Sequence, residues 1–302
     1  MKIKDVTVYL ESLASLHLQE DYDNAGLLIG NPEEECAGII VSLDVTEQVV
    51  EEALKKNCNL IVAHHPIVFK GLKKLNGKNY VERTVIAAIK NNIAVYAIHT
   101  NLDNIINGVN TKIAEKLGLQ NCKVLLPKDG TLKKLVTFSP REKAEEVRNA
   151  LFKSGAGAIG NYNECSFSVE GSGTFKAGEE SHPYVGEIGK RHLENETRIE
   201  VIFPGFLQNK IINDLKKANP YEEVAFYINT LDNLRDDVGS GLTGELPEEI
   251  SEEDLLKQLK NEFTLSVIKH TSFLHKKVKK IALCGGAGIF LLPTAIAAGA
   301  QV

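Results

Sequence analysis

The first part of the chain alternates short apolar runs with amphipathic segments. The apolar runs have the length of buried strands and occupy residues 38–43, 60–63 and 93–98. Residues 46–55 and 80–91 instead carry apolar positions at the spacing of a helix, and Thr46 has the position of an N-cap. Strands that alternate with helices predict a parallel sheet, so we expect a parallel-rich α/β architecture here.

The pattern changes at about Lys133 and returns at about Asp237. The intervening segments predict a strand, a helix, polar-alternating strands, a further strand, a helix and a last strand, at residues 135–138, 139–154, 165–170 with 173–177, 199–203, 206–218 and 224–228. We interpret this as a βαββαβ order, which is typical of an inserted ferredoxin-like α+β domain. We therefore expect residues 1–130 and 237–302 to form the two halves of an outer α/β domain, with the insert at residues 131–236.

The second half begins with a helix signal. Ser251 has the position of an N-cap, with Asp254 three residues later as in a capping box. The following segments predict two strands, a glycine turn and an apolar helix, at residues 265–268, 281–283, 285–288 and 289–298. A further strand of a parallel unit would begin at Gln301, so we expect a chain that is truncated at its C-terminus.

Composition and charge restrict the classes of partner. Hydrophobic residues make up 43% of the chain and charged residues 25%, which is typical of a soluble globular protein. No apolar run has membrane-spanning length, and a formal charge of -5 without a basic block disfavours a nucleic-acid partner. The five cysteines form no C-x-x-C motif and the N-terminus lacks a secretion signal, so we expect a cytoplasmic protein whose metal ligands are His and carboxylates.

Two adjacent histidines follow one of the apolar strands. His64 and His65 come directly after residues 60–63, and Pro66 ends the strand. Tandem imidazoles at this position are metal-ligand candidates, although two histidines can also simply cap a surface strand.

A second polar group follows the next strand. His99 and Asp103 come after residues 93–98, and the carboxyl ends of neighbouring parallel strands lie at one edge of a sheet, about 5 Å apart. We therefore expect Asp103 to join His64 and His65 in one metal site, while a turn or helix-terminal role is its alternative. His99 is a candidate acid or base, or a donor that orients Asp103 or water.

Two glycine-containing segments have a structural and a functional interpretation. Residues 22–30 place Asp23 and Asn24 before Gly26, which fits a simple turn better than an active-site loop. The Gly285–Gly288 turn could cradle a phosphate, but it matches neither nucleotide-binding glycine motif, which favours a tight strand-to-helix turn.

Taken together, three motifs resemble those of the NGG-interacting-factor-like family, whose bacterial members are called GTP cyclohydrolase 1 type 2 homologues. The motifs are His64-His65-Pro66, His99-Thr-Asn-Leu-Asp103 and Asp23-Asn24-x-Gly26. The likeness covers nearly the whole chain, and the insert is similar to the PII/CutA-like domain of the longer members at residues 155–162 and 220–224.

The resemblance implies a dinuclear centre of zinc or iron in a homohexamer, with His64, His65 and Asp103 as ligands. The family completes this centre with a C-terminal H-x-x-x-E segment, whereas residues 276–302 contain no Asp, Glu or His. We therefore expect one or two divalent ions, held with reduced affinity.

Two functional hypotheses follow. The first is a metal-dependent hydrolase of the GTP cyclohydrolase or phosphoesterase type that acts on a nucleotide-like substrate, with His99 as acid or base. The second is a non-enzymatic protein that binds or delivers metal or has a regulatory role, with an insert that senses a small molecule. No base-reading or phosphate-clamping motif identifies the substrate.

Overall fold

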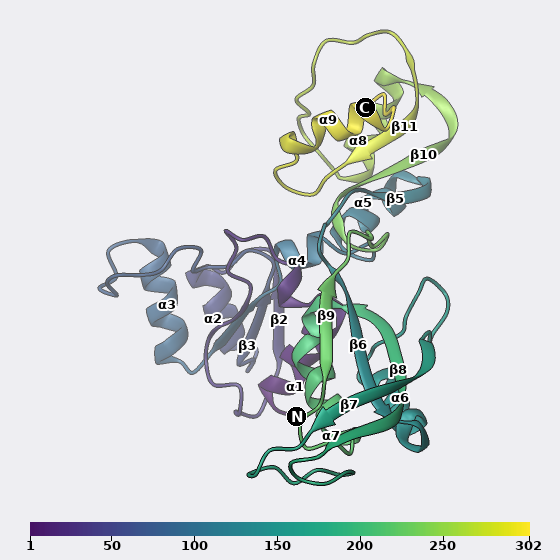
Figure 1. Ribbon diagram of the computed structural model, residues 1–302. Coiled ribbons are helices and arrows are strands. Elements are labelled where there is room, and N and C mark those ends of the chain that lie inside the picture. Colours follow the sequence, from purple (N-terminus) through teal and green to yellow (C-terminus); the bar gives the residue numbers. More distant parts are fainter. The chain divides into compact units, whose positions relative to one another are not determined.

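The computed structural model describes residues 1–302, which form two compact units (Figure 1). The outer unit comprises Met1–Pro127 and Asp236–Val302, and the inserted unit comprises Lys128–Arg235. The inserted unit is thus one continuous segment between two parts of the outer unit. The chain is a mixed α/β protein with three sheets.

The outer unit holds two of these sheets and seven of the α-helices. Its helices are α1 (Ile3–Leu13), α2 (Glu47–Lys55), α3 (Tyr80–Lys90), α4 (Thr100–Asp103), α5 (Val109–Leu117), α8 (Glu252–Glu262) and α9 (Leu292–Ala297). Its strands are β1 (Gly26–Ile29), β2 (Ile39–Ser42), β3 (Leu60–Ala63), β4 (Ala94–Ala97), β5 (Gln120–Pro127), β10 (Gly239–Ser251) and β11 (Lys277–Leu283).

The first sheet has the order β1-β4-β3-β2, and β2, β3 and β4 run parallel as predicted. Every residue of β3 is buried, because helices cover both faces of the sheet. Ile61 and Ala63 share a core with α2 and α3, whereas Leu60 and Val62 share a core with α1. This alternation fixes the direction in which each strand residue points.

The second sheet corrects the expectation that the second half of the outer unit continues a parallel sheet. Its order is β11-β10-β5, and both pairs are antiparallel. Residues 265–268 form no strand, because they follow α8 without a partner strand, and Val267 is 73% exposed. Gln301 donates to the Lys280 carbonyl and Ala282 to the Val302 carbonyl, so the last residues of the chain lie along β11.

Helix starts follow the predicted caps in the outer unit. The Thr46 hydroxyl accepts from the Val49 amide at the start of α2, and the Ser251 hydroxyl accepts from the Asp254 amide at the start of α8. These bonds satisfy amides that have no partner inside the helix.

The inserted unit contains one antiparallel sheet of order β7-β8-β6-β9. Its elements are β6 (Leu132–Pro140), α6 (Ala144–Lys153), β7 (Phe167–Lys176), β8 (Arg191–Pro204), α7 (Gln208–Ala218) and β9 (Phe226–Thr230). The chain order is βαββαβ, and the two polar-alternating segments predicted at 165–177 are the single strand β7. The first helix starts at Ala144 and not at Pro140, because Pro140 ends β6 and a 3-10 turn, η2 (Arg141–Lys143), follows it.

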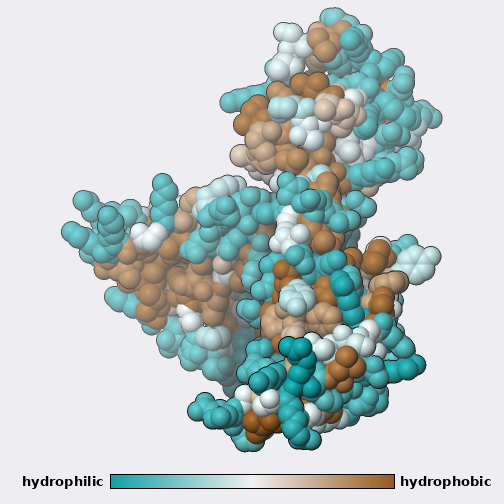
Figure 2. All heavy atoms as spheres, viewed as in Figure 1, coloured by the Kyte–Doolittle hydropathy of each residue, from teal (hydrophilic) through white to brown (hydrophobic).

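Apolar side chains near the C-terminus lie at the surface. Figure 2 shows them gathered over α9 and the preceding 3-10 turn, η4 (Ile289–Leu291). Ile289 is 81% exposed and Ile296 is 67% exposed. None of the helices combines the length and the apolar character needed to cross a membrane.

Because helices cover both faces of the first sheet, a buried and an exposed residue of this sheet should contribute very differently to the free energy of unfolding. We expect Ile61→Ala, at a position with no exposed surface, to lower the free energy of unfolding by about 2–5 kcal/mol, since it leaves a cavity. Val41→Ala in β2, at a position that is 80% exposed, should change it by less than about 0.5 kcal/mol. Urea denaturation followed by circular dichroism measures both, and equal losses would contradict the layered arrangement.

Candidate metal centre

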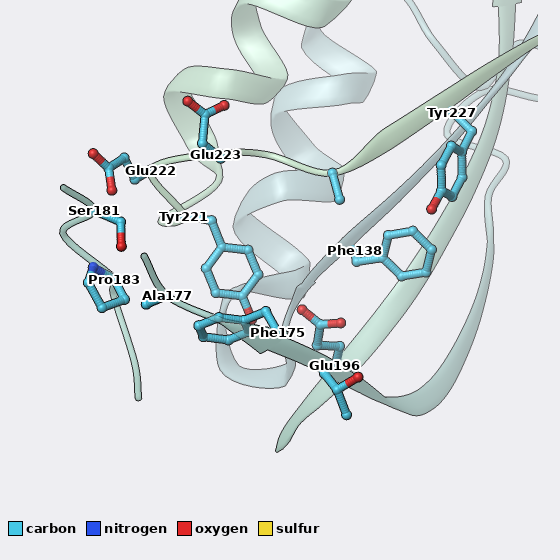
Figure 3. A pocket seen from close by; sticks show the side chains of 13 residues that line it. Phe138, Phe175, Ala177, Ser181, Pro183, Glu196, Tyr221, Glu222, Glu223 and Tyr227 are labelled. Carbon is cyan, nitrogen blue, oxygen red and sulfur yellow. The ribbon is translucent and has the colours of Figure 1, made fainter. Parts of the chain in front are cut away.

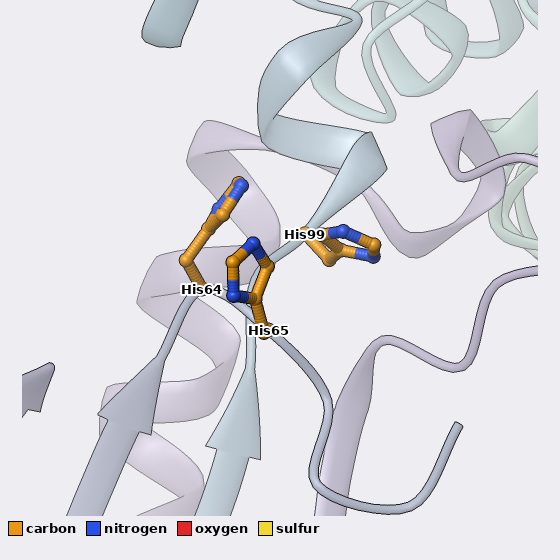
Figure 4. Close-up of side chains that lie close together, drawn as sticks. All are labelled: His64, His65 and His99. Carbon is orange, nitrogen blue, oxygen red and sulfur yellow. The ribbon is translucent and has the colours of Figure 1, made fainter. Parts of the chain in front are cut away.

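The predicted site residues lie at the carboxyl ends of β3 and β4. His64 and His65 follow β3, and their amides donate to the carbonyls of Ser42 and Leu43, which continues the pairing with β2. His99 stands two residues after β4. Figure 4 shows the three imidazoles close together at this end of the two strands. The parallel pairing of β3 with β4 therefore brings both motifs to one place.

The three imidazoles are close enough to share a cation. One ring nitrogen from each of His64, His65 and His99 lies within 4.8 Å of the others. The ring centroids are 5.0 Å apart for His64 and His65, and 5.1 Å apart for His64 and His99. Nitrogens on one zinc ion lie at most about 4.2 Å apart, because each bond is about 2.1 Å long, so small ring rotations would suffice.

Each imidazole has its Nδ1 atom held by an oxygen. The three contacts join His64 to the Ile98 carbonyl at 2.9 Å, His65 to Asp44 Oδ1 at 2.8 Å and His99 to Asp23 Oδ1 at 2.8 Å. Since carbonyl and carboxylate oxygens accept, Nδ1 is the protonated nitrogen in each ring. Nε2 is therefore the nitrogen of each ring that can face a ligand, as in most histidine metal sites.

Asp103 supplies a part-buried carboxylate beside these rings. It lies outside the group of nitrogens, but its Oδ1 is 3.8 Å from His64 Nε2. This oxygen is buried and has no hydrogen-bond partner, although Asp103 ends α4 and could have served a turn. Burial raises the pKa of Asp103, against the opposing effect of the histidines. An unpartnered buried carboxylate oxygen is unfavourable, and a cation would compensate it, so the residues present fit a metal ion.

Asp23 is a site residue that the sequence-based interpretation assigned to a simple turn. Its side chain has no exposed surface, and it accepts hydrogen bonds from His99 Nδ1, from the Thr100 amide and hydroxyl, and from the Asn24 amide. Burial alone would raise the pKa of Asp23, but the hydrogen bonds from His99 and Thr100 outweigh it and lower the pKa. Asp23 is therefore a charged group that fixes the orientation of His99.

The site opens into a cavity of about 730 Å³ within the outer unit. Residues of the second segment of the outer unit line part of it. The Ser240 hydroxyl donates a hydrogen bond to Asn104, and the Gly285 amide donates one to Asn110, so these residues lie against the first segment. The further lining of the cavity includes Tyr22, Gly241, Cys284, Gly286 and Phe290. The turn that contains Gly285 and Gly286 thus lines part of the cavity.

The neighbouring thiol is in its neutral form. Burial, and then the charge of Asp103, raises the pKa of Cys284 above its ordinary value of 9.0. The side chain therefore carries its proton at neutral pH.

The chain is similar to known proteins over its whole length. A sequence model of the family described as Duf34/NIF3 (NGG1p interacting factor 3) matches residues 1–302. A GTP cyclohydrolase 1 type 2 homolog of Bacillus subtilis (strain 168) is 38% identical over 281 residues, which cover 93% of this chain and 75% of that protein. A protein of the same name in Listeria innocua is 35% identical to this chain over 301 residues, which cover 99% of this chain and 80% of that protein.

Solved structures give the same result. The crystal structure of a Bacillus cereus protein related to NIF3 has a TM-score of 0.86 and 39% identity, and the match covers 100% of this chain and 81% of that one. Staphylococcus aureus protein SA1388 has a TM-score of 0.76 and 28% identity, with coverage of 100% and 80%.

The buried contacts of Asp23 predict a pH-dependent contribution to stability. We expect Asp23→Asn to lower the free energy of unfolding at pH 7 by about 1–3 kcal/mol, because it weakens the charged hydrogen bonds to His99 and Thr100. The pKa of Asp23 lies below 3.8 in the folded protein, so the ionised carboxylate stabilises the fold above that pH. The difference between wild type and variant should therefore shrink as the pH falls below 3.8 through the folded-state pKa.

Urea denaturation over a pH series measures this difference. The control is Asp21→Asn, since Asp21 is an exposed acid in the same loop. This substitution should change the free energy of unfolding by less than about 0.5 kcal/mol. A difference that grows on acidification would show that Asp23 is not a stabilising anion.

Proposed function

Because the chain belongs to the Duf34/NIF3 family, we propose that it binds a divalent metal ion through His64, His65 and Asp103. The observation that carries this proposal is the grouping of the three imidazole rings beside Asp103, whose buried Oδ1 lies 3.8 Å from His64 Nε2 and has no hydrogen-bond partner. Imidazole nitrogen and carboxylate oxygen together suit zinc or iron. One or two ions are compatible with this set when water completes the coordination.

We further propose that the site acts as a metal-dependent hydrolase on a nucleotide-like substrate. A bound divalent ion would supply Lewis-acid polarisation and would lower the pKa of water at the site. Asp23 holds the Nδ1 proton of His99, so the free Nε2 can accept a proton from water while the Asp23 charge stabilises the resulting imidazolium. The cavity of about 730 Å³ has room for a substrate of nucleotide size, and relatives carry the name GTP cyclohydrolase 1 type 2 homolog.

A non-enzymatic role in metal binding or delivery is the second candidate. It is favoured by the cavity lining, which contains no Lys or Arg to hold phosphate groups. In this role the histidines and Asp103 exchange ions with the solvent, and the insert senses a small molecule.

The inserted unit and the assembly complete the proposal. We infer that residues 131–236 are a ferredoxin-like domain of the PII/CutA type between the outer segments 1–130 and 237–302, which the βαββαβ order and the antiparallel sheet support. A cytoplasmic homohexamer is the assembly that we propose from the family resemblance.

Metal content tests the ligand set. We expect purified wild-type protein to retain a divalent metal, because the three proposed ligands lie together, and the combined variant His64→Ala, His65→Ala and Asp103→Ala to bind it at least about tenfold more weakly. Elemental analysis after equilibrium dialysis measures both. The control is His270→Ala with His275→Ala, two exposed histidines outside the site. Equal metal content in wild type and triple variant would overturn the assignment.

Turnover separates the two candidate functions. For a hydrolase, His99→Gln should lower kcat by about 100-fold, because it removes the proton acceptor, and leave a metal held by the three proposed ligands in place. Phosphate and formate release from GTP and other nucleotides, measured on metal-loaded protein, provides the assay. Full metal loading with no turnover of any nucleotide would leave the metal-delivery role as the better account.

A further inference from the structure

The inserted unit contains a second cavity, of about 410 Å³, whose lining lies entirely within that unit. It lies on the sheet face opposite the two helices. Thr137 pairs with Ile199, which belongs to the core under α6 and α7, so the next residue, Phe138, points to the other face. Glu196 and Tyr227 point to that face for the same reason.

Aromatic rings form much of the wall. Phe138 and Tyr227 are in edge-to-face contact, with ring centroids 5.9 Å apart. Tyr221 lies edge-on to Tyr184, with centroids 6.2 Å apart. Phe175 also lines the cavity, and Figure 3 shows Phe138, Phe175, Tyr221 and Tyr227 arranged around one space. Faces of aromatic rings attract cations through their quadrupole.

A carboxylate without an ion-pair partner lies in this cavity. Glu194 and Glu200, on the same strand as Glu196, pair with His192 and Arg198, whereas no ion pair holds Glu196. The Glu196 carboxylate lies directly over Gly173, where a Cβ atom would be only 2.0 Å from its Oε2. The absence of a side chain at Gly173 therefore gives the carboxylate its place in the cavity.

The other ionisable groups of the cavity are also acidic, so none of them offsets the negative charge of the Glu196 carboxylate. The Tyr221 hydroxyl is buried without a hydrogen-bond partner of good geometry, and burial together with the nearby Glu196 raises the pKa of the phenol. Glu222 and Glu223 also line the cavity, and its lining contains no Lys or Arg. An anionic or phosphate-bearing ligand is therefore disfavoured, and a cation is favoured.

We propose that this cavity binds a small organic ammonium cation with apolar substituents. Its charged nitrogen would contact Glu196, and its alkyl groups would pack against the rings of Phe175 and Tyr221. Aromatic faces beside one carboxylate fit an alkylated ammonium group better than a bare metal ion, because rings are not metal ligands. The proposal is independent of the metal centre, which lies in the outer unit.

The experiment is isothermal titration calorimetry of the full chain with choline chloride and with 3,3-dimethylbutan-1-ol. These probes have the same shape, but the second has a neutral carbon in place of the ammonium nitrogen. We expect saturable binding of choline and at least about tenfold weaker binding of the neutral probe. Equal binding of the two probes, or no binding of choline, would overturn the proposal.

Variants identify the site. Glu196→Gln keeps the shape and removes the charge, so it should weaken choline binding by about tenfold, and Phe175→Leu should weaken it by about threefold or more. Glu179→Gln, which removes an exposed acid of the neighbouring loop outside the cavity lining, should bind choline as wild type does. Circular dichroism reports whether each variant is folded. Wild-type affinity in folded Glu196→Gln and Phe175→Leu would also overturn the proposal.

Discussion

The parallel pairing of β3 with β4 is the constraint on which the candidate metal centre depends. The two strands pair in one register, from Leu60 opposite Ala94 to Ala63 opposite Ala97. Both strands are buried throughout, so a slip by one residue would turn every apolar side chain to the wrong layer. The register therefore fixes where each strand ends, and with it the relative positions of the histidines that follow.

Around this fixed edge, hydrogen bonds from outside the site orient the imidazoles. The Ile98 carbonyl, Asp44 and Asp23 hold the three Nδ1 atoms, so each ring presents its Nε2 atom before any ligand arrives. Asp23 and Asp103 place two carboxylates in a part-buried environment. Hydrogen-bond donors satisfy the Asp23 carboxylate, whereas the Oδ1 atom of Asp103 has no donor. The unsatisfied oxygen of Asp103 favours a cation over an anion at this place.

The two candidate sites differ in the chemistry of the residues that line them. The cavity of the outer unit brings imidazole nitrogens together with the Asp103 carboxylate, which are groups of the kind that bind metal ions. The cavity of the inserted unit places a glutamate that has no ion-pair partner among aromatic rings, whose faces attract organic cations. Each lies within its own unit, so ligands at the two places can be tested separately.

The sequence by itself determined the local features of the fold and the ligand candidates. The period of the apolar residues predicted β3 and β4, Thr46 and Ser251 predicted helix starts, and the polar residues after two parallel strands predicted the candidate site, because these signals arise from neighbours along the chain. Only the tertiary structure decided the rest. Asp23 meets His99 across 76 positions, the second sheet is antiparallel, and residues 265–268 find no partner strand. Long-range pairing and burial select among local alternatives, and their energy comes from contacts that no short window of sequence contains.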